Sequence, residues 1–264
     1  MPTLSPEPHQ QRQMAESFGV DAERYDRVRP RYPDALIRTV VEASPGNHIL
    51  DVGCGTGIVS RQLQAAGCDV LGVDVDERMA EFARRTGVEV EVSPFESWDP
   101  GGRTFDAVVA GMTWHWIDPV AGAAKAAEVL EPGGQLAVFW NVFQPPSDLA
   151  KAFAAVYREV LPDRPAYHRV SASPLDAYLA FLGKAADGMR ESGAFGEPER
   201  WQFPWSRPYS RDEWIEQVRT GGDASQFDPS KFDELLTGIG AAVDAAGGSF
   251  QMDFTALTLT ATRS

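Results

Sequence analysis

Two aspartates and a glycine-rich turn carry most of the chemistry that this sequence could perform. Residues 49–52 read Ile-Leu-Asp-Val, which is typical of a buried strand, and Gly53, Gly55 and Gly57 follow at alternate positions. An apolar-periodic helix is expected directly after them. Strand, glycine turn and helix form the arrangement in which a backbone approaches a nucleotide-like ligand closely, because a Cβ would obstruct both the turn and the ligand.

The spacing of the glycines limits the classes of ligand that this turn could bind. A dinucleotide fingerprint needs a small residue where this chain has Ile58, and a phosphate-binding Walker loop needs a lysine that is absent here. No lysine or arginine lies between Gly53 and Ser60 to meet a phosphate. A nucleoside-like ligand without phosphates therefore fits best, and a tight turn without any ligand is the alternative.

A second acid supports the same ligand. Residues 69–73 read as another strand and end at Asp74, which lies 23 positions after Asp51. This is close to the ~20-residue spacing at which an acid reaches ribose hydroxyls. A carboxylate there would accept two hydroxyl hydrogen bonds and would repel a 2′-phosphate.

The formal net charge of −14 narrows the partners. A polyanion would be repelled over most of so acidic a surface, so nucleic acid and anionic membranes are disfavoured and a small-molecule partner is expected. Cys54 and Cys68 have neither metal-ligand spacing nor a disulfide pattern, which favours a reduced, cytoplasmic setting without a metal. No run approaches the ~18 apolar residues of a membrane span. We expect a soluble monomer or homodimer.

Alternating strand and helix patterns predict an α/β fold with a mostly parallel sheet and helices on both faces. Strands are expected at 48–52, 69–73, 88–92, 104–110, 135–140, 199–209 and 250–263. Helices are expected at 57–66, 76–85, 119–130, 148–161, 174–190, 211–219 and 229–246. The resulting division is an N-terminal helical segment (1–44), a Rossmann-like core (45–144), a helical cap inserted after the fifth strand (145–198) and a C-terminal part of the core (199–264).

Four stretches in order resemble the motifs of the class I S-adenosylmethionine (SAM)-dependent methyltransferases: residues 50–57, 72–79, 105–109 and 131–136. The opening segment 25–33 and Trp114-His115-Trp116 are similar to the small-molecule subgroup related to trans-aconitate methyltransferases. The resemblance implies a seven-stranded sheet with the last strand inserted between the fifth and the sixth. It also implies transfer of the SAM methyl group to an oxygen, nitrogen or carbon nucleophile by in-line displacement, with S-adenosylhomocysteine (SAH) as product.

The resemblance also implies contacts to the cofactor. Asp51 would approach the methionine amino group, Asp74 would bind the ribose hydroxyls, and Met79 would pack beside the adenine. Pro94 stands where the family often has an aspartate, so Phe95 is left to read the adenine ring. The predicted cofactor-binding residues are Asp51, Gly53, Cys54, Gly55, Gly57, Asp74, Val75, Met79, Phe95, Glu96 and Ala110.

His115 is the histidine that we consider as a general base, since an unperturbed imidazole takes up a proton near neutral pH. A structural histidine–tryptophan pair is the alternative. Arginines before the first strand could bind a carboxylate of the substrate or the cofactor, or form surface ion pairs. The predicted substrate-binding residues are Tyr25, Arg29, Arg31, Tyr32, Trp114, Trp116, Asn141 and His168.

Two other functions stay open. An NAD-dependent oxidoreductase could use a similar sheet, although Ile58 and the missing Tyr-x-x-x-Lys pattern argue against it. A SAM-binding protein without methyl transfer would carry the same glycine loop and Asp74.

Overall fold

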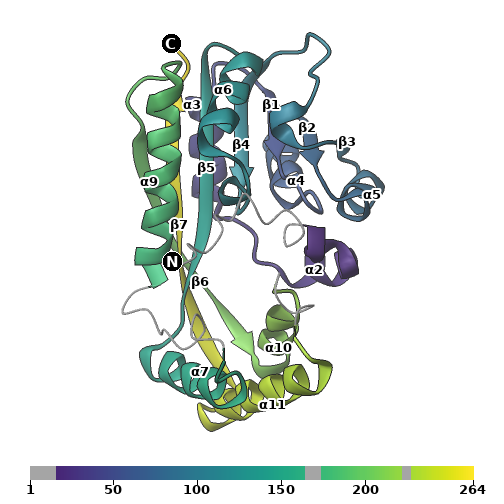
Figure 1. The fold of residues 1–264 in the computed structure, drawn as a ribbon, viewed down its shortest axis with the longest axis vertical. Helices are drawn as coiled ribbons and strands as arrows, with labels where there is room; N and C mark the ends of the chain where they lie inside the picture. The colour runs from purple at the N-terminus through teal and green to yellow at the C-terminus, as the bar shows by residue number, and fades with distance from the viewer. Residues whose placement is uncertain (1–15, 164–173, 222–226) are drawn as a thin grey trace, which may run out of the picture.

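The computed structural model describes residues 16–163, 174–221 and 227–264 (Figure 1). Its elements in chain order are η2 (Glu16–Asp21), α2 (Ala22–Val28), α3 (Asp34–Ala43), β1 (His48–Val52), α4 (Ile58–Ala65), β2 (Asp69–Asp74), α5 (Glu77–Arg85), β3 (Glu89–Val92), η3 (Phe95–Ser97), β4 (Phe105–Gly111), η4 (Trp114–Trp116), α6 (Pro119–Val129), β5 (Leu130–Gln144), α7 (Ser147–Val160), α9 (Pro174–Ser192), β6 (Glu199–Ser210), α10 (Arg211–Arg219), α11 (Pro229–Ala245) and β7 (Ser249–Thr262). The predicted strands and helices are confirmed, with ends that shift by a few residues.

The strands form one seven-stranded sheet in the order β3-β2-β1-β4-β5-β7-β6. Strands β1 to β5 pair in parallel, and β7 runs antiparallel between β5 and β6. This confirms the predicted sheet and the insertion of the last strand. Pro204 and Pro208 lie in β6, where proline is tolerated because an edge strand leaves one row of backbone groups unpaired.

Both faces of the sheet are covered, because successive side chains of a strand point to opposite sides. Leu50 belongs to a core that α6 and α9 close, whereas its neighbour Ile49 belongs to a core that α3 and α4 close. Both side chains are fully buried. The covered β1 strand therefore holds Asp51 rigidly at its carboxyl end.

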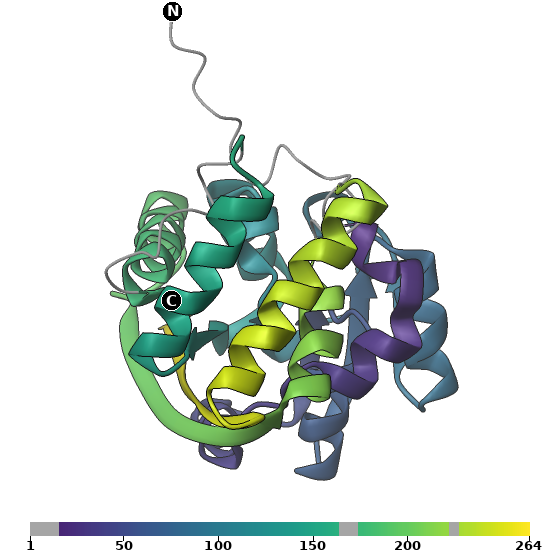
Figure 2. The ribbon, with the colours of Figure 1, turned by 90° about the horizontal axis from the view of Figure 1, so that it is seen from below.

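A further apolar core lies beyond that end of the sheet. The long strands β5, β6 and β7 continue past the parallel strands, and α7, α10 and α11 gather on their ends (Figure 1). Seen from below, α7 and α11 lie side by side, and α10 lies beside α2 (Figure 2). The predicted cap 145–198 is thus divided, since α7 joins this lower group while α9 runs back along α6 and the sheet.

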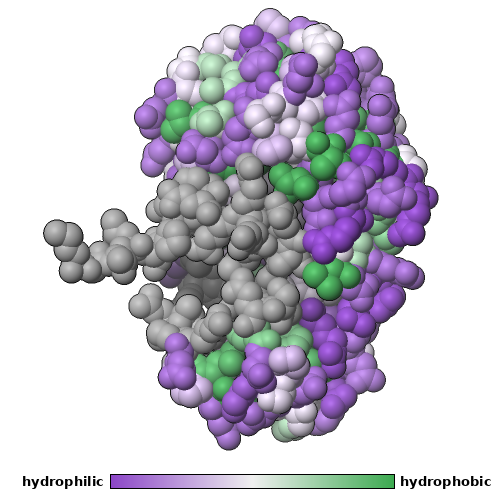
Figure 3. All heavy atoms as spheres, turned by 45° about the vertical axis from the view of Figure 1, so that its right-hand side comes forward, coloured by the Kyte–Doolittle hydropathy of each residue, from purple (hydrophilic) through white to green (hydrophobic). Residues whose placement is uncertain are grey.

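The surface in Figure 3 is mainly hydrophilic, with small, separated hydrophobic groups. This agrees with the acidic composition of the chain. Among the described helices, none combines the length and the apolar character that crossing a membrane would require.

Candidate active site

A cavity opens where the carboxyl ends of β1, β2, β4 and β5 meet the N-terminal segment, the edge at which parallel sheets bind ligands. It is lined by Tyr25, Arg29, Pro30, Tyr32, Asp51, Val52, Gly53, Cys54, Gly55, Thr56, Ile58, Val59, Val73, Asp74, Val75, Met79, Ser93, Phe95, Glu96, Gly111, Met112, Thr113, His115, Trp116, Ile117, Asn141 and Phe143. Most of the residues predicted from the sequence are therefore brought together in one place.

The glycine loop forms one wall. Gly53 has a φ of +64°, and a Cβ there would lie 2.3 Å from the side chain of Thr113, so only glycine fits. Gly53, Cys54 and Gly55 line the cavity. Gly57 lies outside the cavity lining and precedes α4 as its N-cap, with a φ of +83°. The first two glycines thus face the cavity, whereas the third precedes the helix.

Asp74 ties the end of β2 to the glycine loop. Its Oδ2 accepts a hydrogen bond of 2.7 Å from the Gly55 N–H, and its Oδ1 accepts one of 2.8 Å from the Asp76 N–H. The Val75 N–H also contributes a backbone hydrogen bond, and because a carboxylate has about four acceptor positions, Asp74 retains capacity to accept a hydrogen bond from a ligand hydroxyl. Burial raises the pKa of Asp74 to about 6, although the backbone hydrogen bonds oppose this.

Asp51 is the more deeply buried of the two acids, with an exposed fraction of 1%. The Ser60 hydroxyl donates a hydrogen bond of 2.6 Å to its Oδ2. Burial, and to a smaller extent the charge of Asp74, raise the pKa of Asp51 to about 7. The cavity thus has a carboxylate whose charge is costly until a cation approaches it.

Val75, Met79, Phe95 and Glu96 line the side of the cavity predicted for the adenine. Phe95 is buried, and its ring is tilted against that of Trp114 with centroids 6.3 Å apart. Glu96 accepts a hydrogen bond of 3.3 Å from the Asp118 N–H, which places it at the start of α6. An apolar slot bounded by an acid is therefore available for a flat ring.

His115 lies in the cavity wall with its ring fixed on two sides. Its Nδ1 accepts a hydrogen bond of 3.1 Å from Trp140 Nε1, and its ring stacks on Phe181 with centroids 4.9 Å apart. Because an indole N–H only donates, the neutral imidazole carries its proton on Nε2. Burial lowers the pKa of His115 to about 4, so the ring stays neutral above pH 5.

The other residues predicted near η4 differ in whether they reach the cavity. Trp116 lines the cavity, and the centroid of its ring lies 4.7 Å from that of the His115 ring. Trp114 is 2% exposed, packs in the core with Phe95, and lies outside the cavity lining. Ala110 is likewise fully buried within β4 and outside the lining. Of these three, only Trp116 contributes a side chain to the cavity.

The N-terminal segment places Tyr25, Arg29 and Tyr32 in the cavity and turns Arg31 away from it. Tyr32 is held by two backbone hydrogen bonds to the side chain of Gln62, and burial raises its pKa well above the usual value. Arg31 pairs with Asp26 at 3.3 Å. Arg29 and Arg31 therefore have different surroundings although they are two positions apart.

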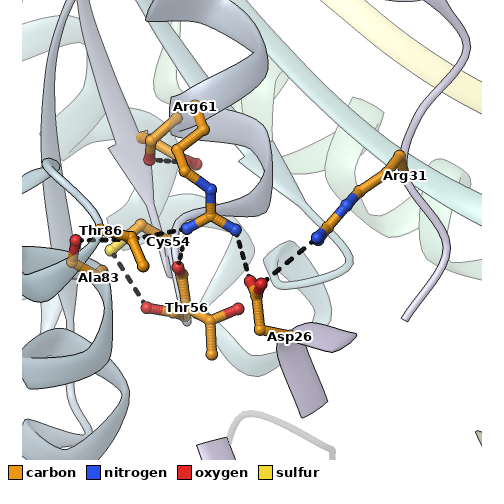
Figure 4. Close-up of polar contacts among 10 residues, drawn as sticks. Asp26, Arg31, Cys54, Thr56, Arg61, Ala83 and Thr86 are labelled. Carbon is orange, nitrogen blue, oxygen red and sulfur yellow. Dashed lines mark hydrogen bonds and ion pairs between the residues drawn. The ribbon is translucent and has the colours of Figure 1, made fainter. Parts of the chain in front are cut away.

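Arg61 of α4 joins this segment to the glycine loop (Figure 4). Its Nη1 donates to the Thr56 carbonyl at 2.6 Å and to Thr86 Oγ1 at 2.8 Å, and its Nη2 donates to Asp26 Oδ1 at 2.5 Å. The half-buried Asp26 has a lowered pKa because the arginine hydrogen bonds outweigh the opposing effect of burial. One guanidinium thus links α2, the glycine loop and the end of α5.

Asn141, at the end of β5, connects the same segment to β6. Its Nδ2 donates to the Arg31 carbonyl at 3.3 Å, and its Oδ1 accepts from Trp205 Nε1 at 3.1 Å. The side chain is 2% exposed and lines the cavity. His168, the other predicted substrate contact, lies outside the described residues.

Sequence reasoning missed several lining residues, among them Met112, Thr113 and Phe143. Met112 has a φ of +59°, which is uncommon for a residue with a Cβ and is concentrated at functional sites. No sequence signal announces that conformation. Phe143 could have been found, because it follows Asn141 by two positions and shares its face of β5.

Comparison with known proteins relates part of this chain to methyltransferases. Residues 49–134, from the first strand to the turn within β5, match the model of a family described as a methyltransferase domain. This stretch of the chain is similar to that family. A curated relative, an uncharacterised methyltransferase of Mycobacterium tuberculosis, is 34% identical over 132 residues, which are 49% of this chain and 54% of the relative. The match thus spans about half the length of that relative.

Solved structures show the same fold over most of the chain. A putative type II methyltransferase from Anaeromyxobacter dehalogenans superposes with a TM-score of 0.61 at 21% identity, over 89% of this chain and 97% of that one. A phosphoethanolamine N-methyltransferase of Haemonchus contortus, solved with phosphomonomethylethanolamine and SAH, gives a TM-score of 0.51 at 16% identity, over 99% of this chain and 60% of that one. The chain therefore shares the seven-stranded, Rossmann-like α/β fold of these structures.

Proposed function

We propose that this protein transfers the methyl group of SAM to an oxygen, nitrogen or carbon atom of a small molecule. The observation that carries the proposal is the pair of buried acids, Asp51 and Asp74, which end adjacent strands and line one cavity with the glycine loop. SAM has a ribose with two free hydroxyls and a cationic amino-acid part, and the cavity offers an acid for each.

The residues present fit the cofactor. Asp74 lines the cavity and keeps acceptor capacity beside its backbone hydrogen bonds, which suits a ribose hydroxyl. Asp51 is a buried carboxylate with a raised pKa, and an ammonium or sulfonium group would relieve the cost of its charge. The pyrophosphate of NAD would instead meet the acids Asp51, Asp74 and Glu96 of the cavity wall.

When bound, SAM supplies a methyl group that its sulfonium already activates. The protein then has to align the acceptor behind that group and keep water out. Tyr25, Tyr32, Trp116 and Phe143 form aromatic walls that suit this task. The Trp140 hydrogen bond and the burial of His115 favour its Nε2–H as a hydrogen-bond donor to the acceptor rather than as a base.

The finer predictions from the sequence are part of this proposal. An acceptor of the trans-aconitate type rests on the resemblance, and the absence of nucleic-acid partners rests on the net charge of −14. A cytoplasmic setting rests on Cys54 and Cys68, which have no disulfide pattern. SAM binding without methyl transfer is the competing function, because the same acids and loop would serve it.

Calorimetry with SAM, SAH and NAD tests the proposal. We expect micromolar binding of both adenosyl ligands and none of NAD. Asp74→Asn should weaken SAH binding by at least about tenfold, because an amide NH2 replaces one oxygen and cannot accept a hydrogen bond from a ribose hydroxyl. Formation of SAH from SAM in the presence of acceptor mixtures then separates an enzyme from a binding protein. A folded sample that binds neither adenosyl ligand would overturn the proposal.

A further inference from the structure

The charges around the cavity are unevenly distributed. Asp51 and Asp74 stand at the strand ends, and Glu96 lies on the adenine side. Among the described residues that line the cavity, Arg29 is the sole lysine or arginine, and it comes from the turn that follows α2. The cavity is therefore acidic at its adenosyl end and cationic at the N-terminal segment.

Arg29 is held in place from two directions. Its backbone N–H caps α2 by donating to the Tyr25 carbonyl at 3.0 Å, and its guanidinium carbon lies 4.8 Å from the centre of the Tyr25 ring. Its Nη2 donates to the Thr220 carbonyl at the end of α10. A guanidinium fixed against an aromatic ring is oriented before any ligand arrives, and its planar fork matches a carboxylate.

Neighbouring arginines lack this placement. Arg31 pairs with Asp26, which Arg61 also contacts (Figure 4). Arg27 of α2 is mostly exposed and pairs with Glu216 of α10 at 3.3 Å. Neither Arg27 nor Arg31 lines the cavity. The opening arginine-rich segment therefore directs one guanidinium, that of Arg29, into the candidate site.

We propose that Arg29 anchors a carboxylate in the cavity, opposite the acids that receive the adenosyl group. The surrounding walls are aromatic, formed by Tyr25, Tyr32, Trp116 and Phe143, so the carboxylate belongs to a molecule with a flat or extended apolar body or to the amino-acid part of SAM itself. This inference rests on the proposed function. Both sources share one chemistry, and the experiment separates them.

The first arm uses the cofactor. Calorimetry compares SAH with its amine analogue that lacks only the carboxylate, on the wild type and on Arg29→Gln. If the cofactor supplies the carboxylate, Arg29→Gln should weaken SAH about tenfold or more and leave the analogue within about twofold. Arg27→Gln is the matched control, because it removes an arginine two positions earlier, in α2, that also contacts α10.

The second arm uses an acceptor probe. Cinnamate and its uncharged isostere cinnamamide are titrated into the SAH-saturated protein and followed by tryptophan fluorescence, to which Trp116 in the wall contributes. If the acceptor supplies the carboxylate, the wild type should prefer cinnamate, and Arg29→Gln should remove that preference. Arg29→Lys keeps the charge but loses the fork, so an intermediate preference is expected.

Selective weakening of the carboxylate-bearing ligand in either arm supports the anchor and identifies its source. The inference is overturned if Arg29→Gln changes neither the affinity for SAH relative to its amine analogue nor the affinity for cinnamate relative to cinnamamide. This includes the case in which cinnamate does not bind. Thermal unfolding of each variant shows that it is folded. Loss of SAH binding by the wild type would instead refute the proposed function, so the two failures are distinguishable.

Discussion

Replacing Asp51 with asparagine should stabilise the ligand-free protein at pH 8 while weakening its binding of SAH. Asp51 is almost completely buried, and its carboxylate accepts hydrogen bonds from the hydroxyl and the backbone N–H of Ser60. Asparagine keeps a carbonyl oxygen that can accept the hydrogen bond from the Ser60 hydroxyl, and it removes the charge. The substitution therefore isolates the cost of holding an anion in the cavity wall.

The size of the effect follows from the pKa of Asp51, which folding raises from 3.8 to about 7. The folded state keeps its proton over a range in which the unfolded chain has lost it. The stability from this group is thus complete below about pH 4, falls as the pH rises toward 7, and is lost above that. Three pKa units correspond to about 4 kcal/mol, which a neutral side chain would recover at pH 8.

Thermal unfolding of both proteins at pH 8 and pH 5 measures this gain. We expect Asp51→Asn to unfold about 10 °C higher at pH 8, and less than half of the free-energy gain should remain at pH 5. Asp74 is shifted in the same direction, to about pH 6, and is present in both proteins. An asparagine variant that is less stable than the wild type at pH 8 would refute the reasoning.

The same protonation acts on the ligand. If the ammonium group of SAH pairs with ionised Asp51, binding has to expel the proton of this acid below pH 7. The affinity of the wild type for SAH should then fall about tenfold between pH 8 and pH 6. The affinity of Asp51→Asn, which is lower at pH 8, should fall much less over this range. Calorimetry in two buffers of different ionisation enthalpy measures the released proton. A pH-independent affinity would contradict the pairing.

Three further predictions concern the loop and its neighbours. Asp26→Asn removes the charge that pairs with Arg61, which in turn contacts the glycine loop, so SAH should bind about fivefold more weakly with little change in unfolding temperature. The control Glu197→Gln disturbs an exposed ion pair elsewhere and should leave SAH binding unchanged. Nitrogen-detected NMR should find His115 protonated on Nε2 and not titrating above pH 5, and titration near pH 6.5 would contradict its burial. Gly53→Ala should abolish SAH binding and cost about 1–3 kcal/mol of unfolding free energy, measured with urea, because the φ is positive and Thr113 occupies the Cβ position; an alanine variant that binds normally would show that the loop adapts.

The sequence was most informative where local patterns determine position. A short apolar run that ends in an acid indicates a buried strand end, and this located Asp51 and Asp74. The glycines after the first of these runs located the loop between the first strand and helix. Alternation along the last strand predicted its extent, and the family resemblance implied its place between the fifth and the sixth strand.

Side-chain direction outside regular elements was beyond reach of the sequence. Arg29 and Arg31 look equivalent in a basic stretch, but the turn before Pro33 directs one to the cavity and the other to Asp26. The environment of His115 depends on Trp140, which is 25 positions away and reaches it across the sheet. Such contacts come from tertiary packing, which no local spacing encodes.

A crystal structure of the protein with SAH tests the central claim most directly. The account predicts the two ribose hydroxyls on the carboxylate of Asp74, the adenine against Phe95 and Met79, and the amino group near Asp51. Adenosyl density at any other place, or a ribose without contact to Asp74, would contradict it.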